Sequence, residues 1–281
     1  MKKIILSLSV IAAVAAVVVG ATTAFFSDTE TSTGNTFTAG AIDLKIDNSA
    51  WYNGNAVDGS TWGPKDLEEG NFFFNLSDLK PGDWEEDTIS LHVDNNNAWA
   101  CVDVTLTQDD EVTLKEPEED LGDVADTSDL FDGELAQELQ FIWWADDGDN
   151  VLEEDENVIN SGNLGWAPEG QTVNVTLADK NNNIWTRISG DPLEGEQPYY
   201  IGKAFCLGEL DEENNTYSPW IDGDENNGED NSGPGSRRVA CDGKDVSNWS
   251  QSDSVMMDIS FRAEQSRNNP DFSCQAQENA S

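Results

Sequence analysis

The sequence predicts an all-β protein, an antiparallel β-sandwich of jelly-roll type with acidic loop and short helical insertions. Apolar and polar residues alternate with a period of two in several stretches rich in β-branched residues, as is typical of half-buried antiparallel strands. Residues that favour turns, such as Asn53-Gly54 and Pro81-Gly82, separate these stretches, and helical periodicity is scarce. The inward-facing apolar residues are Ile42, Leu44 and Ile46; Ile89, Leu91 and Val93; Val102, Val104 and Leu106; Val173, Val175 and Leu177; and Val255, Met257, Ile259 and Phe261.

Two segments interrupt this pattern and are predicted to be insertions between strands. The first covers residues 114–160 and contains Leu130–Gln140, where Leu135 and Leu139 have helical spacing and Asp132 is the expected N-cap. The second covers residues 209–240 and consists mainly of Asp, Glu, Asn and Gly, which predicts loop structure.

The composition is strongly acidic. The 281 residues include 56 acidic and 14 basic side chains, for a formal net charge of -42. Such a surface repels nucleic acids and anionic membranes, so neither is an expected partner. The charge favours solubility in salty or divalent-rich water, and binding of several cations is the compatible functional alternative. A hydrophobic content of 37% with ten Trp is enough for a packed core.

The first 24 residues have the pattern of a secretory signal peptide. Lys2 and Lys3 precede an apolar run from Ile4 to Val19, and small residues follow at Thr22-Thr23-Ala24. The alternative is a permanent anchor, but the run is shorter than the roughly 18–20 residues that a spanning helix needs. We therefore expect a secreted protein that contacts the membrane only before cleavage between Ala24 and Phe25.

Four cysteines in an exported chain favour two disulfides, and three pairings are open. Cys206 and Cys241 bracket the second acidic insertion, whereas Cys101 and Cys274 lie on predicted strands near opposite ends of the chain. The preferred pairing is Cys206–Cys241 with Cys101–Cys274.

Two acidic loops are candidate calcium sites, because closely spaced carboxylates and amides around a glycine suit a hard cation that takes six to eight oxygen ligands. Neither loop has the spacing of an EF-hand, and the alternative for both is a solvated acidic turn. The candidate ligands are Asp146, Asp147, Asp149 and Glu153 in the first loop, and Asp222, Asp224 and Asn226 in the second.

The sequence favours a protein that is not an enzyme. His92 is the only histidine, so the chain cannot supply the two histidines of an HExxH zinc site. A Ser-His-Asp triad would also have to use His92, and no nucleophile motif accompanies it.

Three groups of residues, in the same order along the chain, resemble the landmarks of the TasA/camelysin family of exported fibre subunits. The first follows the predicted cleavage site, the second combines a turn with the end of a strand, and the third is the closing strand. The matching residues are Phe25-Phe26-Ser27-Asp28 with Phe37, Ala39-Gly40 and Ile42-Asp43-Leu44; Leu79-Lys80-Pro81-Gly82-Asp83 with Val93-Asp94-Asn95; and Phe261-Arg262-Ala263-Glu264-Gln265 continuing to Cys274.

The resemblance implies a subunit of a biofilm matrix or pilus-like filament that is cut by a dedicated signal peptidase. It also implies assembly by donor-strand exchange, in which a free N-terminus pairs with the next copy of the chain in a head-to-tail homopolymer. Camelysin-like relatives carry a peptidase label, which the residues above do not support. The alternatives are a monomeric cation- or glycan-binding cell-surface domain and, third, a camelysin-like metallopeptidase.

These inferences define the expected organisation of the chain. Residues 1–24 are the signal peptide, 25–36 the donor segment, and 37–281 the β-sandwich with its two insertions. The tip of the donor segment consists of Phe25, Phe26, Ser27, Asp28 and Thr29.

We predict that the mature protein begins at Phe25, because Thr23-Ala24 presents the small residues that a signal peptidase accepts. N-terminal sequencing of the secreted protein checks this. A secreted chain that still begins at Met1 would contradict the prediction.

Overall fold

The computed structural model describes most of the chain after the N-terminal segment, and within those residues antiparallel strands dominate. The all-β sandwich is therefore confirmed, while the jelly-roll type stays a prediction. The predicted cleavage site, the donor segment 25–36, Glu153 and the second predicted calcium loop lie outside the described residues. The described residues are 42–126, 128–150, 152, 156–210, 220–221, 238–239 and 241–275.

The larger sheet has the strand order β2-β1-β4-β9-β6-β7, and β3 also pairs with β1. All of its strand pairs are antiparallel. Its strands are β1 (Asp43–Tyr52), β2 (Asn55–Ala56), β3 (Trp62–Lys65), β4 (Trp84–Asp94), β6 (Leu139–Asp146), β7 (Asn157–Asn163) and β9 (Pro198–Leu207).

The smaller sheet has the order β14-β5-β8, with β5 in the centre. Its strands are β5 (Ala98–Asp110), β8 (Thr172–Ala178) and β14 (Ser254–Gln265). The remaining elements are short: β10 (Glu209–Leu210) with β13 (Cys241–Asp242), β11 (Trp220–Ile221) with β12 (Arg238–Val239), the helices α2 (Glu116–Leu121) and α3 (Leu135–Glu138), and the 3-10 turns η1 (Asp58–Ser60), η2 (Leu164–Trp166) and η3 (Asn248–Ser250). Within the described part of the chain, no helix has the length and apolar character needed to cross a membrane.

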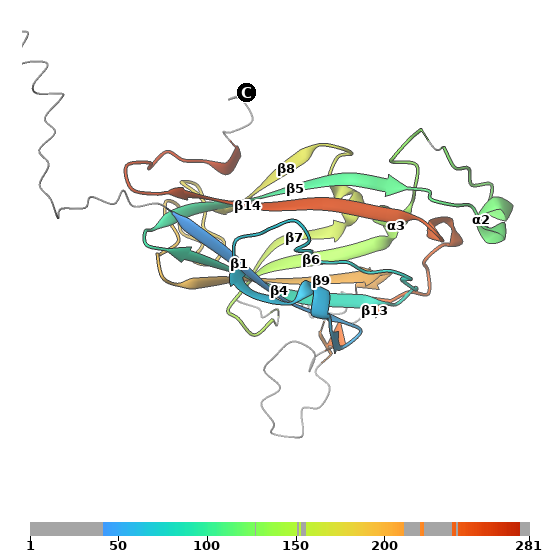
Figure 1. Cartoon of the computed structure of the whole chain (residues 1–281), viewed down its shortest axis with the longest axis horizontal. Helices are drawn as coiled ribbons and strands as arrows, with labels where there is room; N and C mark the ends of the chain where they lie inside the picture. The colour runs from blue at the N-terminus through green and yellow to red at the C-terminus, as the bar shows by residue number, and fades with distance from the viewer. Residues whose placement is uncertain are drawn as a thin grey trace, which may run out of the picture. The chain divides into compact units, whose positions relative to one another are not determined.

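The two sheets face each other across one apolar core. Figure 1 shows β14, β5 and β8 in one layer and β1, β4, β9 and β6 in the other. Leu91 and Ile201 of the larger sheet belong to the same buried cluster as Val102 and Val104 of the smaller one. Since alternate residues of a strand point to opposite faces, the period-two pattern in the sequence places these side chains between the layers.

Every stretch with alternating residues forms a strand, as the sequence predicts: β1, β4, β5, β8 and β14. The predicted turn at Asn53-Gly54 is also present. Tyr52 pairs with Asn55, which leaves a two-residue hairpin loop, and both loop residues have positive φ values of 47° and 76°. Asn-Gly is the preferred sequence for such a loop, because both residues tolerate the left-handed region.

The prediction for residues 114–160 was wrong in part. Leu139–Asp146 is not part of an insertion but forms β6, which lies between β9 and β7. Phe141 and Trp143 pack in the main core, whereas Ile142 and Trp144 pack in a second buried cluster on the opposite face. A strand buried on both faces lacks alternation, so its sequence resembles a buried helix.

The predicted helix Leu130–Gln140 is reduced to the four residues of α3. Asp132 does not cap it. Its carboxylate instead accepts hydrogen bonds from the backbone N–H groups of Glu111 and Asp126. The helix ends where Leu139 enters β6, because pairing with β9 satisfies the backbone from that point onward.

Both predicted disulfides are present. Cys101 of β5 is joined to Cys274, with a Cα–Cα distance of 5.7 Å. Phe272 and Cys274 pack with Trp99 and Cys101 in a small apolar cluster, so the C-terminal segment covers part of the outer face of the smaller sheet. Cys206 of β9 is joined to Cys241 of β13 and closes the second acidic insertion.

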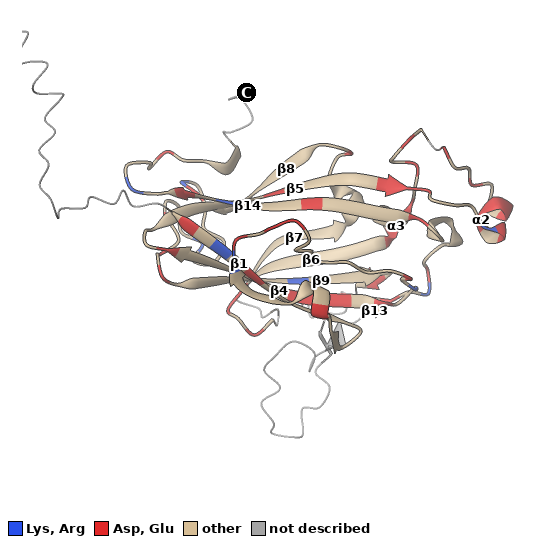
Figure 2. Ribbon diagram, viewed as in Figure 1, with Lys and Arg blue, Asp and Glu red and all other residues tan. Residues whose placement is uncertain are grey.

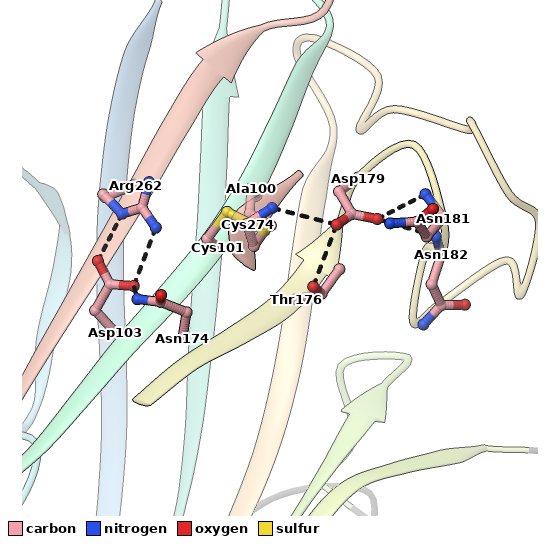
Figure 3. Close-up of a disulfide and its surroundings, with 10 residues drawn as sticks. All are labelled: Ala100, Cys101, Asp103, Asn174, Thr176, Asp179, Asn181, Asn182, Arg262 and Cys274. Atoms are coloured by element: carbon pink, nitrogen blue, oxygen red, sulfur yellow. Dashed lines mark hydrogen bonds and ion pairs between the residues drawn. A yellow bond between two sulfur atoms is a disulfide. The ribbon is translucent and has the colours of Figure 1, made fainter. Parts of the chain in front are cut away.

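Polar contacts surround the Cys101–Cys274 disulfide (Figure 3). Asp179 accepts hydrogen bonds from the backbone N–H groups of Cys274 and Asn181, at 3.2 and 2.7 Å. Asp103 of β5 binds Arg262 of β14 and accepts a hydrogen bond from Asn174 of β8, which links all three strands across the outer face.

We expect the Cys101→Ala/Cys274→Ala double variant to lose more stability than Cys206→Ala/Cys241→Ala. The first disulfide spans 173 positions and the second 35. If disulfides act by restricting the unfolded chain, the longer loop contributes roughly 1.5 kcal/mol more. Urea unfolding of both variants checks this, and equal losses would show that loop entropy does not set the difference.

Candidate functional site

The first predicted calcium loop is organised around Asp146 at the end of β6. Asp146 is 3% exposed. Its Oδ1 accepts a hydrogen bond from Trp144 Nε1 at 3.0 Å, and its Oδ2 accepts from the backbone N–H groups of Gly148 and Asn150 at 2.8 and 3.1 Å. Burial raises the pKa of Asp146 to about 6. Both oxygens therefore hold the turn that leaves β6.

The other predicted ligands of this loop are less buried. Asp147 is exposed and its backbone N–H donates to Glu156 Oε1 at 3.0 Å, while Asp149 is half-buried. Glu153, like Asp222, Asp224 and Asn226 of the second loop, lies outside the described residues. Calcium binding at either loop stays a prediction.

The structure brings together a different set of carboxyl groups, which the sequence analysis missed. We call it the acidic cluster; it consists of Glu111, Glu118, Asp123, Glu134 and Asp253. Carboxylate oxygens of Glu111, Asp123 and Glu134 lie within 4.8 Å of one another, and those of Glu111, Glu118 and Asp253 do so as well. Such groups could hold a metal ion.

Three segments supply the acidic cluster. Glu111 follows the last residue of β5, and Asp253 precedes the first residue of β14, so the pairing of these strands places them together. Glu118 lies in α2, Asp123 just after it, and Glu134 just before α3. Figure 2 shows acidic residues, in red, at this end of β5 and on α2.

Burial and mutual repulsion disfavour the charged forms of these groups. Burial, followed by the nearby carboxyls of Asp253, Glu118 and Asp123, raises the pKa of Glu111 to about 8. Burial and the charges of Asp123, Asp253 and other neighbours raise the pKa of Glu134 to about 7. Burial and repulsion thus favour the protonated forms of Glu111 and Glu134 over their charged forms.

A second group of buried charges lies inside the sandwich. Lys203 of β9 and Asp87 of β4 are both fully buried, and Lys203 Nζ lies 2.9 Å from Asp87 Oδ2. Glu85 is also fully buried on the same face of β4. Lys203 Nζ lies 5.1 and 4.5 Å from the ring centres of Phe74 and Phe205, within the range of a cation–π contact.

One lysine faces two carboxyls in this group, so one carboxyl is uncompensated. Burial raises the pKa of Glu85 to about 8, although Lys203 opposes the shift. Burial likewise raises the pKa of Asp87 to about 6, against the effect of its ion pair with Lys203. The arrangement favours a protonated Glu85 beside the Asp87–Lys203 pair at neutral pH.

The smaller sheet exposes part of the core along β14. Among the described strands, β14 pairs only with β5. Met257, Ile259 and Phe261 point to the core side, opposite Leu106, Val104 and Val102, yet they are only half-buried while these three partners on β5 are buried. This edge therefore combines unpaired backbone groups with partly exposed apolar side chains.

A family model described as Camelysin metallo-endopeptidase matches residues 1–208. The chain belongs to the camelysin family. The match ends at Gly208, next to the second acidic insertion, so it covers all strands of the larger sheet and β5 and β8 of the smaller one. A search of curated proteins found no match.

The camelysin family name implies a metal-dependent peptidase, but the residues of this chain do not fit a zinc site. His92, the only histidine, lies on β4 with its Nε2 3.0 Å from Asp47 Oδ2 on the neighbouring strand β1. The acidic cluster has only carboxylate oxygens, whereas zinc sites in peptidases are built around histidine nitrogens. No catalytic step follows from this geometry.

We predict that Glu85→Gln flattens the dependence of stability on pH. The pKa of Glu85 is about 8 in the folded protein and ordinarily 4.5, so the folded state holds the extra proton between these values. The free energy of unfolding of the wild type should therefore fall as the pH rises from about 5 to 8, by up to about 1.4 kcal/mol per pH unit from this group.

The measurement is urea unfolding of wild type and variant across this pH range. Glu68→Gln removes the same charge from an exposed position and is the control, since it should leave the slope unchanged. Parallel pH profiles for wild type and Glu85→Gln would contradict the assignment.

Proposed function

We propose that this chain is a secreted structural subunit that polymerises into extracellular fibres, as a biofilm matrix or pilus-like filament. The observation that carries the proposal is the free edge of β14, a long strand that pairs with β5 alone among the described strands and is lined on the core side by half-buried apolar residues. Membership of the camelysin family supports it, and so does the separate resemblance of the N-terminal and closing landmarks of the sequence to those of exported fibre subunits.

The proposed mechanism is donor-strand exchange. A strand from another copy would pair with β14 through main-chain hydrogen bonds, and its apolar side chains would cover Met257, Ile259 and Phe261. Unpaired edges are generally covered in native proteins, and here the neighbouring subunit would cover this one. Because the contact is head-to-tail and does not close, it would produce a filament.

The proposed donor is the segment that begins with Phe25 and Phe26. It combines two large apolar side chains with a polar spacer that contains no large aliphatic residue before Phe37. Such a segment gains little by burial against its own subunit and more by filling an apolar site on another. Cleavage by a dedicated signal peptidase would release the donor only after export, which would prevent early assembly.

We also propose that the chain is not a peptidase. A single histidine, held against Asp47, supports this, as does the all-oxygen chemistry of the acidic cluster. Of the other candidate functions, cation binding has specific support, because the acidic cluster gathers carboxyl groups from three segments.

Deleting residues 25–33 should yield a folded monomer that does not form filaments, since β1 and the core remain intact. Phe25→Asp and Phe26→Asp should each weaken assembly about ten- to hundred-fold, the range expected from losing a buried Phe. Ser27→Asp adds the same charge within the polar spacer and is the control. Electron microscopy and sedimentation measure assembly, and unchanged filaments from the deletion variant would exclude donor-strand exchange.

Two neighbouring methionines of β14 allow a separate test of the edge that is proposed to accept the donor strand. Met257 points to the core side, whereas Met256 is 51% exposed. Met257→Lys should impair filaments, and Met256→Lys should not, with the circular dichroism of both monomers unchanged. Equal assembly by the two variants would place the subunit contact elsewhere.

A further inference from the structure

The orientation of the carboxyl groups in the acidic cluster distinguishes them from ordinary surface acids. Glu111 is 4% exposed, Glu118 is 0% exposed and Asp123 is 9% exposed, while Glu134 and Asp253 are half-buried. Surface carboxylates point into water, but these point toward one another across distances within 4.8 Å. Bringing like charges this close in a buried place is unfavourable unless a cation or protons neutralise them.

In three of these carboxyl groups, a backbone N–H group donates a hydrogen bond to one of the two oxygens. The other oxygen of each group remains available to the cluster. Glu111 Oε1 accepts from Thr113 N–H at 3.1 Å, Asp123 Oδ1 from Val124 N–H at 2.7 Å, and Asp253 Oδ2 from Glu134 N–H at 2.7 Å. The opposite oxygens are buried, and no N–H or hydroxyl donor of the described residues reaches them: Glu111 Oε2, Asp123 Oδ2 and Asp253 Oδ1, together with Glu134 Oε2. Outer hydrogen bonds that fix a carboxylate while its second oxygen stays available are characteristic of metal ligands.

No basic side chain among the described residues forms an ion pair with the cluster. Elsewhere in the described residues, Lys203 pairs with Asp87, Arg262 with Asp103, and Lys45 with Asp43 and Asp94. The ion pairs found among the described residues include none of the five carboxyls of the acidic cluster. The nearest donors are backbone N–H groups and Ser252 Oγ, which lies 3.4 Å from both carboxylate oxygens of Glu118.

We propose that the acidic cluster is a calcium-binding site, with Glu111 as its central ligand and Glu118, Asp123, Glu134 and Asp253 around it. Calcium takes six to eight oxygen ligands in flexible geometry and accepts both one- and two-oxygen binding by carboxylates. A set of oxygens without nitrogen or sulfur disfavours zinc, and ligands from three separate segments do not suit the strict octahedron of magnesium.

Calcium at this site would join parts of the chain that lie far apart in the sequence. Glu111 follows β5, Asp253 precedes β14, and Glu118 and Asp123 flank the end of α2. A bound ion would therefore tie the segment between β5 and β6 to the start of β14. The proposal stands independently of polymerisation, because it uses only side chains within one subunit.

The test uses the mature chain from Phe25, first freed of metals by a chelator. Calcium binding is followed by isothermal titration calorimetry and by the melting temperature, at constant ionic strength, with sodium and magnesium as comparison salts. A single binding event is expected to raise the melting temperature by about 5–10 °C at 100 times the dissociation constant.

Glu111→Gln should weaken calcium binding at least ten-fold, because this carboxyl belongs to both groups of three. Asp123→Asn is the second variant, with the same expectation. Glu116→Gln makes the same charge change on the exposed face of α2 and should bind as the wild type does.

Circular dichroism of the calcium-free variants establishes that each is folded before binding is compared. If Glu111→Gln and Asp123→Asn bind calcium as tightly as Glu116→Gln, the site assignment is overturned. If calcium and sodium give the same melting curve, calcium binding itself is overturned, and an equal response to magnesium would overturn the choice of calcium.

Discussion

Burying carboxyl groups within a chain of net charge -42 is the constraint on which this structure depends. Inside the sandwich, Lys203 makes this feasible, since its ammonium group lies between Asp87 and the rings of Phe74 and Phe205. A buried ion pair contributes little net stability, but removing one partner leaves an uncompensated charge and is strongly destabilising. The position of Lys203 on β9, paired with β4, therefore favours this pairing of the two central strands over alternatives.

On the outer face of the smaller sheet, carboxylates are also compensated by neighbouring groups, although they are more exposed there. Asp103 on the central strand pairs with Arg262 and accepts a hydrogen bond from Asn174, so one carboxylate links β14, β5 and β8. Asp179 is compensated by backbone N–H groups instead, including that of Cys274 in the disulfide. Together with the cluster of Trp99 and Phe272, these contacts attach the C-terminal segment to β5.

In the acidic cluster, by contrast, no basic side chain of the described residues compensates the carboxyl groups. Its carboxyls receive backbone hydrogen bonds on one oxygen and face one another with the other, and no ion pair of the described residues reaches them. The cluster offers carboxylate oxygens as ligands, and the single histidine of the chain, His92, pairs instead with Asp47 on β1. A metal ion held by these carboxyl groups would be compatible with the structural role in a fibre that we propose.

The sequence by itself determined the strands that alternate and the turn at Asn53-Gly54, and it favoured the disulfide pairing that the structure then selected from three. Each of these depends on local periodicity, on the conformational tolerance of one or two residues, or on the position of cysteines relative to an insertion. The resemblance at the N-terminus and the closing strand likewise identified the family before the fold was considered. The all-β class followed from these local signals alone.

Only the tertiary structure decided the role of Leu139–Asp146 and the location of the candidate metal site. The strand β6 is apolar on both faces because it is covered on both faces, which no local pattern distinguishes from a short helix. The acidic cluster combines Asp253 with residues 111–134, and these meet only because β14 pairs with β5 along its full length. Because acidic residues are common throughout the chain, the close spacing of carboxylates in a loop such as 146–150 is a weak predictor of a metal site. The decisive property is instead burial without a partner, and burial arises only when distant segments pack together.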